Sequence, residues 1–116
     1  MAWKAAINLS TLQQANRQTT TIDGNKILLI WHDNQVHAVQ AQCPHLKLPL
    51  QKGKINDKCH IVCPFHKSAF DLKTGAVQCW SPWPPAIGTL LGKISKPHPL
   101  RIYPTRIEDD HIFVEI

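Results

Sequence analysis

Long apolar runs are missing from this sequence, and cysteine is scarce in it. The longest apolar run, residues 27–31, is far shorter than the roughly 18 residues that a membrane-spanning helix needs. The first twenty residues include Lys4 and Arg17 and contain no apolar stretch typical of a secretory signal. Four cysteines in 116 residues are too few for a fold held together by disulfides. We therefore expect a soluble, cytoplasmic protein that keeps its cysteines reduced and has no membrane partner.

Arginine-rich helices and nucleic-acid stacking motifs are also absent. The chain has 13 Lys and Arg against 8 Asp and Glu, which gives a formal net charge of +5. A basic surface without those motifs indicates an acidic protein partner rather than nucleic acid. The length of 116 residues fits one domain with a real core, and we expect no second, catalytic domain.

Short apolar or alternating runs separated by turn residues are typical of an all-β protein. We expect strands at residues 19–22, 26–31, 36–40, 60–62, 69–72, 101–107 and 112–116, and turns at 23–25, 32–34 and 73–75. One short helix is expected after Ser10, because Ser10 and Gln13 form a capping-box pattern. Residues 80–99 contain five of the nine prolines and predict a long loop.

Two short boxes, each mixing one cysteine with one histidine, indicate a metal site. Cys43-Pro44-His45 is followed by seventeen residues and then by a second box at residues 63–66, with the sequence Cys-Pro-Phe-His. Together the two boxes offer two thiolates and two imidazoles. Such a set suits an iron–sulfur cluster and also suits tetrahedral zinc. Zinc sites more often pair cysteine with cysteine and histidine with histidine, so the mixed boxes favour the cluster.

The two boxes resemble those of Rieske-type [2Fe–2S] proteins. Residues 27–40 resemble the family's strand pair, residues 68–75 its usual continuation after the second box, and residues 100–107 its closing strands. The resemblance implies that Cys43 and Cys63 bind one iron of one [2Fe–2S] cluster, and that His45 and His66 bind the other. It also implies a single Rieske domain over residues 1–116, built as an antiparallel β-sandwich. A small cluster-binding subdomain of two loops would cover about residues 43–79, and the proline-rich loop about residues 80–99.

The chain departs from the high-potential Rieske proteins at several positions. Leu48 and Phe65 stand where those proteins carry an extra pair of cysteines joined in a disulfide. Lys67 replaces a glycine that usually follows the second histidine. Ser68 matches a serine that donates a hydrogen bond to the cluster, whereas Phe70 stands where a tyrosine donates another. We therefore expect a reduction potential in the lower or middle part of the Rieske window of roughly −150 to +300 mV.

The resemblance implies an electron-transfer protein rather than an enzyme. The leading interpretation is a monomeric ferredoxin that carries single electrons from a reductase to a terminal oxygenase or a related enzyme. One alternative is a small Rieske subunit of a larger reductase of the nitrite reductase type, and another is a zinc-stabilised binding module. Lysines around the boxes predict partners with acidic docking surfaces; they are Lys47, Lys52, Lys54, Lys58, Lys67 and Lys73.

The remaining cysteines, histidines and tryptophans carry no such box. Cys59 and Cys79 are expected to be buried free thiols. Trp3 and Trp31 are expected in the core. Structural or surface roles are expected for His32, His37, His60, His98 and His111.

Overall fold

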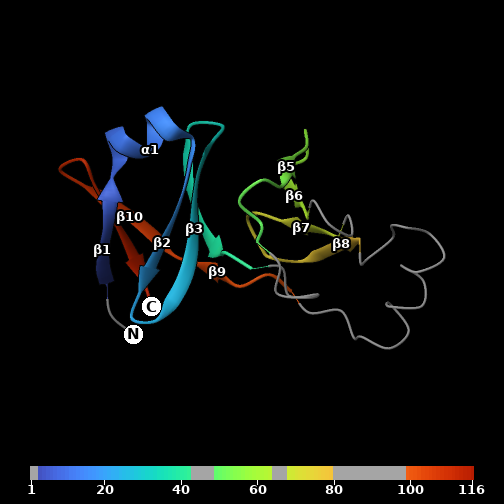
Figure 1. Cartoon of the computed structure of the whole chain (residues 1–116). Helices are drawn as coiled ribbons and strands as arrows, with labels where there is room; N and C mark the ends of the chain where they lie inside the picture. Colours follow the sequence, from blue (N-terminus) through green and yellow to red (C-terminus); the bar gives the residue numbers. More distant parts are fainter. Residues whose placement is uncertain (1–2, 43–48, 64–67, 80–98) are drawn as a thin grey trace. The chain divides into compact units, whose positions relative to one another are not determined.

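The computed structural model describes residues 3–42, 49–63, 68–79 and 99–116 (Figure 1). The chain divides into two compact units: the first unit is Met1–Ala41 with Ile102–Ile116, and the second unit is Gln42–Arg101. Nearly all regular structure in both units is antiparallel β-sheet, which confirms the all-β prediction. The arrangement of both units as one domain over residues 1–116 stays a prediction.

The first unit contains two antiparallel sheets and one helix (Figure 1). One sheet has the strand order β1-β11-β10 and the other has the order β2-β3-β4-β9. The helix α1 covers only Leu9–Ala15, and no helix of the described residues is long and apolar enough to cross a membrane. The strands are β1 (Trp3–Asn8), β2 (Arg17–Ile22), β3 (Asn25–His32), β4 (Gln35–Gln40), β9 (Ile102–Tyr103), β10 (Thr105–Glu108) and β11 (His111–Glu115).

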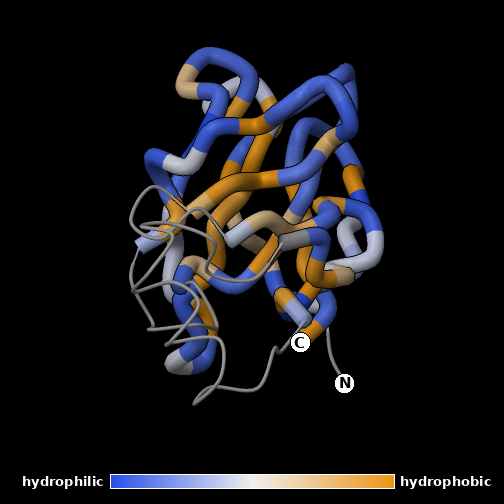
Figure 2. The backbone as a smooth tube through the Cα atoms, turned by 90° about the vertical axis from the view of Figure 1, so that its right-hand side faces the viewer, coloured by the Kyte–Doolittle hydropathy of each residue, from blue (hydrophilic) through white to orange (hydrophobic). Residues whose placement is uncertain are grey.

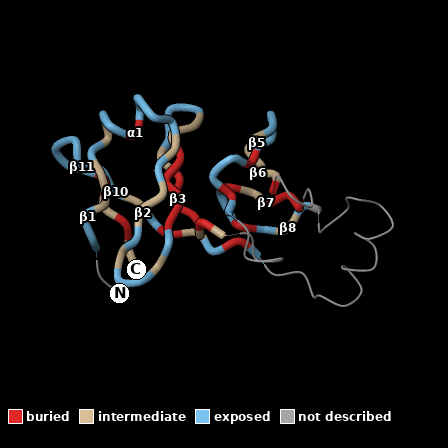
Figure 3. Tube along the Cα trace, viewed as in Figure 1, coloured by how far each residue is buried: buried red, intermediate tan, exposed pale blue. Residues whose placement is uncertain are grey.

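Apolar patterning explains the core of the first unit. In β3 four consecutive residues, 27–30, are at most 1% exposed, so this central strand is buried on both faces (Figure 3). In β11 only the alternate residues Ile112 and Val114 are buried, as the period-two pattern predicts. Figure 2 shows the same division, with hydrophobic stretches alternating with hydrophilic ones along the described chain.

The hairpin turns of the first unit lie where the sequence predicts them. Asp23 and Gly24 connect β2 to β3, and Asp33 and Asn34 connect β3 to β4; all four have positive φ. Two-residue turns of this hand match the right-handed twist of the strands that they join. The hairpins therefore follow from local turn chemistry.

The expected strand over residues 101–107 is wrong in its extent. Residues Ile102–Tyr103 pair with β4, whereas Thr105–Glu108 pair with β11 in the other sheet. Pro104 lies between the two segments, where a residue without a backbone N–H interrupts a strand at low cost. The strands β1, β5 and β8 were not predicted at all.

Helix α1 was predicted, but its capping box is wrong. The helix begins at Leu9 after Asn8, whose side chain makes no capping hydrogen bond. Ser10 lies inside the helix, and its Oγ donates to Oδ2 of Asp110 (2.8 Å) while its N–H donates to Oδ1 (3.2 Å). The backbone N–H of Leu9 also donates to the carbonyl oxygen of Asp110 (2.8 Å). The turn between β10 and β11 therefore satisfies the first N–H groups of the helix.

The core assignment of the tryptophans is half right. Trp31 is half-buried and packs against the core of the first unit. Trp3 is 36% exposed, and the guanidinium of Arg106 lies over its ring, 4.7 Å from the centroid. Trp3 therefore makes a surface cation–π contact instead of filling the core.

The second unit is a small antiparallel sheet with the strand order β5-β6-β7-β8. Ile61 and Phe70 are opposite each other in the register of β6 and β7, and both are 0% exposed. The buried residues Leu50 and Leu72 add to this core. The strands are β5 (Lys54–Ile55), β6 (His60–Val62), β7 (Ala69–Asp71) and β8 (Val77–Cys79).

Candidate metal centre

One of the four predicted ligands, Cys63, lies among the described residues. It follows β6 directly, is 1% exposed and forms no disulfide. The predicted ligands Cys43, His45 and His66 lie outside the described residues. In the described ranges no three His, Cys, Asp or Glu side chains gather into a metal site. The ligand set therefore remains a prediction. The structure describes the residues on either side of the two boxes, which we call the frame of each box.

The second box is framed by the hairpin of β6 and β7. The backbone N–H of Cys63 donates to the carbonyl oxygen of Ser68 (2.7 Å), and Val62 pairs with Ala69 directly before. Residues 64–67 therefore start and end at neighbouring strand ends. A short loop closed in this way has little freedom to separate its two ends.

The first box is framed in a similar manner. Gln42 and Pro49 form an antiparallel bridge, so residues 43–48 also start and end side by side. The chain then continues through the buried Leu50, whose carbonyl oxygen accepts a hydrogen bond from the N–H of Gly53 (2.8 Å). Both boxes thus extend from closed pairs of chain segments within the second unit.

Gly53 allows the segment after the first box to approach the strand before the second. A Cβ atom at Gly53 would lie 2.6 Å from the carbonyl oxygen of Val62 and 3.1 Å from Cγ1 of Ile61. Val62 is the residue that precedes Cys63. The missing side chain therefore lets the frames of the two boxes pack against each other.

The predicted hydrogen-bond donor Ser68 is 0% exposed at the end of the second loop. Phe70, two residues later, is 0% exposed and brings no hydroxyl to the interior. Lys67 lies outside the described residues. The role of Ser68 toward the cluster stays a prediction, supported by its burial beside Cys63.

The other cysteines and histidines do not join Cys63 in a described site. Cys59 forms no disulfide, as predicted, but it is half-buried rather than buried, and it lies in the turn before β6. Cys79 ends β8, and its side chain is not described. His37 is buried in β4, whereas His111 is exposed, with Nδ1 2.8 Å from the carbonyl oxygen of Asp109. His32 and His60 are half-buried, and His98 lies outside the described residues.

Charge is divided very unevenly between the two units. The second unit contains nine Lys and Arg against two Asp, a formal charge of +7, and the first contains four against six acidic residues, a charge of −2. Lys52, Lys54, Lys58 and Lys73 are exposed, while Lys47 and Lys67 lie outside the described residues. The unit that carries the boxes is therefore also the one with the excess of positive charge.

The described frame fits a [2Fe–2S] cluster held between two loops. Cys63 is buried, so its sulfur would be shielded from water as a thiolate ligand, and both boxes belong to the same compact unit. Gly53 provides the close approach that brings their frames together. Thiolate ligands from Cys and imidazole ligands from His are the donor set of Rieske centres.

Comparisons with known proteins agree with this arrangement. The chain is 26% identical over 90 residues to the 3-phenylpropionate/cinnamic acid dioxygenase ferredoxin subunit of Photorhabdus laumondii subsp. laumondii, covering 78% of this chain and 72% of that protein. The ferredoxin of carbazole 1,9a-dioxygenase from Nocardioides aromaticivorans IC177 has a similar structure, with a TM-score of 0.76 at 22% identity, over 98% of this chain and 97% of that one.

A structure described as a putative nitrite reductase NADPH (small subunit) oxidoreductase protein is also similar. Its TM-score is 0.74 at 20% identity, and the match covers 100% of both chains. These two structural similarities establish the fold. The family model described as Rieske [2Fe-2S] domain matches residues 2–104, nearly the whole chain. The chain therefore belongs to the Rieske [2Fe-2S] domain family, whose members bind one Rieske-type cluster.

Proposed function

We propose that this protein is a ferredoxin that carries single electrons from a reductase to a terminal oxygenase or a related enzyme. The observation that carries the proposal is the Rieske match over residues 2–104, together with a described frame that closes both ligand loops within one unit. A relative that is a dioxygenase ferredoxin subunit supports the oxygenase as the electron acceptor. The chain itself acts as an electron carrier rather than a catalyst.

Four side chains hold the cluster in this proposal. Cys43 and Cys63 bind one iron, and His45 and His66 bind the other. The bound cluster supplies reversible storage of one electron, with a formal charge of zero when oxidised and −1 when reduced. The buried position of Cys63 keeps water away from its sulfur, and Ser68 donates a hydrogen bond that stabilises the reduced state.

The partners dock through acidic surfaces against the second unit, which carries a formal charge of +7. Opposite charges speed the encounter of two proteins and align them before contact. We further propose that the carrier is a cytoplasmic monomer without membrane or nucleic-acid partners, since a diffusing carrier must release each partner in turn.

A small subunit fixed to a larger reductase is the second candidate function. The similarity to the putative nitrite reductase small subunit along the whole of both chains favours it. Gel filtration and affinity purification of the natively expressed protein distinguish the two functions. A free monomer of 13.1 kDa supports the carrier. Stable co-purification with a large flavoprotein or haem protein supports the subunit.

The ligand assignment is tested by single substitutions of the purified holoprotein. We expect Cys43→Ser, Cys63→Ser, His45→Gln and His66→Gln each to lose the rhombic paramagnetic signal that dithionite produces. Iron and sulfide content should fall with it. Cys59→Ser and His111→Gln serve as matched controls, because neither side chain belongs to a box, and both should keep the signal.

If the chain were instead a zinc-stabilised binding module, the purified protein would contain no iron–sulfur cluster. A colourless protein with one zinc and no sulfide would overturn the cluster assignment and the carrier function together. If Cys59→Ser lost the rhombic paramagnetic signal and Cys63→Ser kept it, the assignment of Cys63 as a ligand would be overturned.

A further inference from the structure

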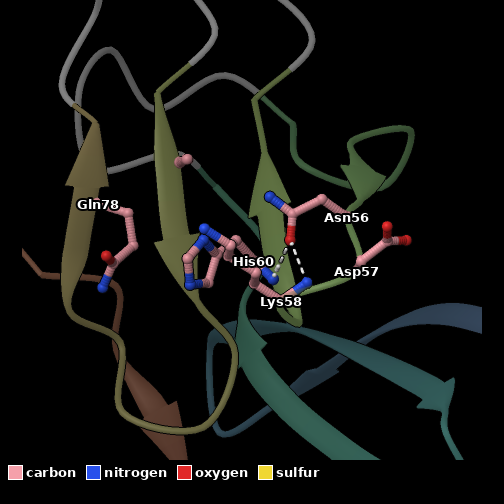
Figure 4. A pocket seen from close by; sticks show the side chains of 6 residues that line it. Asn56, Asp57, Lys58, His60 and Gln78 are labelled. Atoms are coloured by element: carbon pink, nitrogen blue, oxygen red, sulfur yellow. Dashed lines mark hydrogen bonds between the residues drawn. The ribbon is translucent and has the colours of Figure 1, made fainter.

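An open pocket of about 480 Å³ lies in the second unit, outside the two boxes. Figure 4 shows polar side chains around it, contributed by the turn before β6, by β6 itself and by β8. Ala69 of β7 is the one apolar residue among those that line it. The lining residues are Asn56, Asp57, Lys58, His60, Ala69 and Gln78.

The turn that forms one wall is held rigidly by hydrogen bonds. Oδ1 of Asn56 accepts hydrogen bonds from the N–H groups of Lys58 and His60, each at 3.0 Å (Figure 4). The N–H of Cys59 donates to the carbonyl oxygen of Asn56, and the N–H of Asn56 donates to that of His60. A side-chain amide that closes its own turn in this way is fixed before any ligand arrives.

These bonds decide which polar atoms remain for a ligand. The amide oxygen of Asn56 is occupied, so its amide nitrogen, a donor, is the atom left without a partner among the described residues. The ammonium group of Lys58 is a second donor, and the amide of Gln78 supplies a third from β8. The lining therefore offers hydrogen-bond donors on three residues, and donors are what the oxygen atoms of a carboxylate require.

The acidic side chains near the pocket do not cancel this preference. Oδ1 of Asp71 accepts hydrogen bonds from the N–H groups of Lys73 (2.7 Å) and Thr74 (3.2 Å). Its Oδ2 lies 3.8 Å from Nε2 of His60, so both oxygens of this carboxylate already have partners within the second unit. Asp57 is the remaining carboxylate of the lining and is exposed at the rim.

We propose that this pocket binds one carboxylate side chain of an acidic redox partner, through Lys58, Asn56 and Gln78. The formal charge of +7 on the unit selects an acidic protein as the occupant. The inference rests on the proposed carrier function and adds a specific docking point to it. Asp57 also lines the pocket, and its negative charge weakens the attraction for that carboxylate.

A fluorescently labelled hexaglutamate peptide is the probe of the test, with the intact holoprotein at low salt and fluorescence anisotropy as the readout. Lys58→Gln should weaken binding about five- to tenfold, because it removes both a charge and a charge-assisted hydrogen bond. Lys52→Gln is the matched control: Lys52 is an exposed lysine of the same unit outside the pocket, and its loss should cost less than twofold. Asp57→Asn should strengthen binding about twofold.

Carbodiimide coupling of the same peptide, followed by mass spectrometry, identifies which lysine contacts the carboxylate. Coupling at Lys58 in preference to Lys52 supports the pocket. Equal losses for Lys58→Gln and Lys52→Gln, or equal coupling at both lysines, would show diffuse attraction only and would overturn the docking point. The carrier function is read separately, from the reversible one-electron titration of the same samples, and it fails only if that titration fails.

Discussion

Ser68 and Phe70 are the two buried positions at which we expect a hydroxyl group to change the reduction potential of the cluster. Both are 0% exposed directly after the loop, and only Ser68 has a hydroxyl group. We expect Ser68→Ala to lower the reduction potential by roughly 40–90 mV, the equivalent of about 1–2 kcal/mol for one electron, because the reduced cluster loses a hydrogen bond. Phe70→Tyr should raise the potential by a similar amount.

Protein-film voltammetry measures both shifts, with Ser10→Ala of the first unit as the control that should not move the potential. If the reduction potential were unchanged in both Ser68→Ala and Phe70→Tyr, neither side chain would influence the potential of the cluster.

Cys59 occupies a backbone conformation that is unusual for its residue type. Its φ of 62° lies in the left-handed region, at the end of the turn that begins at Asn56. We expect Cys59→Gly to raise the free energy of unfolding by about 0.5–1 kcal/mol, because relief of about 1–2 kcal/mol of strain exceeds the extra freedom that glycine has in the unfolded chain. Urea denaturation of the holoprotein measures the change.

Cys59→Ala is the matched variant, because it removes the thiol and keeps the strain. It should be less stable than Cys59→Gly. Equal stability of the two variants would contradict backbone strain at this position.

At the scale of elements, the contact between the segment after the first box and β6 depends on Gly53. A methyl group there would lie 2.6 Å from the backbone oxygen of Val62, which cannot move without displacing Cys63. We expect Gly53→Ala to destabilise the protein by about 1–3 kcal/mol and to reduce the iron content of the purified protein. Chemical denaturation and iron analysis measure the two effects.

Gly24→Ala separates steric overlap from backbone strain. Gly24 has a φ of 81° but no atom within 4 Å of a Cβ built on it, so its substitution strains only the turn between β2 and β3. It should cost about 1 kcal/mol and leave the iron content unchanged. Equal iron loss in both variants would show that the close approach of Gly53 to Val62 is not specifically needed for iron binding.

The elements also show which parts of the fold the sequence could predict. The hairpins from β2 to β4 were predicted because Asp23-Gly24 and Asp33-Asn34 carry their turn chemistry locally. The two-residue strand β5 was missed because so few residues show no periodicity, whereas β1 and β8 were missed for no such local reason. The capping box failed because the partner of Ser10 is Asp110, one hundred residues away.

At the scale of the whole molecule, the two units have formal charges of opposite sign. The second unit has a formal charge of +7 and the first has −2. We expect the rate of reduction by its reductase to fall as ionic strength rises, because salt screens the attraction between exposed charges. Stopped-flow measurements between about 20 and 500 mM salt test this dependence.

Charge reversal at matched positions in the two units tests which unit attracts the reductase. Lys54→Glu in the second unit should slow the reaction severalfold at low salt, whereas Lys26→Glu in the first should change it less than twofold; both lysines are exposed on strands. A rate that is independent of salt, or equal slowing by both variants, would contradict steering by the second unit.

The sequence by itself determined the class of fold and the kind of cofactor, because the evidence for both is local. Alternating strands, turn residues and two Cys-His boxes can each be recognised within a few neighbouring residues. Only the tertiary structure decided how the boxes are framed: by the bridge of Gln42 with Pro49, by the bond from Cys63 to Ser68, and by the approach of Gly53 to Val62. Such contacts join segments distant in the chain, and spacing along a sequence does not reveal which segments will meet.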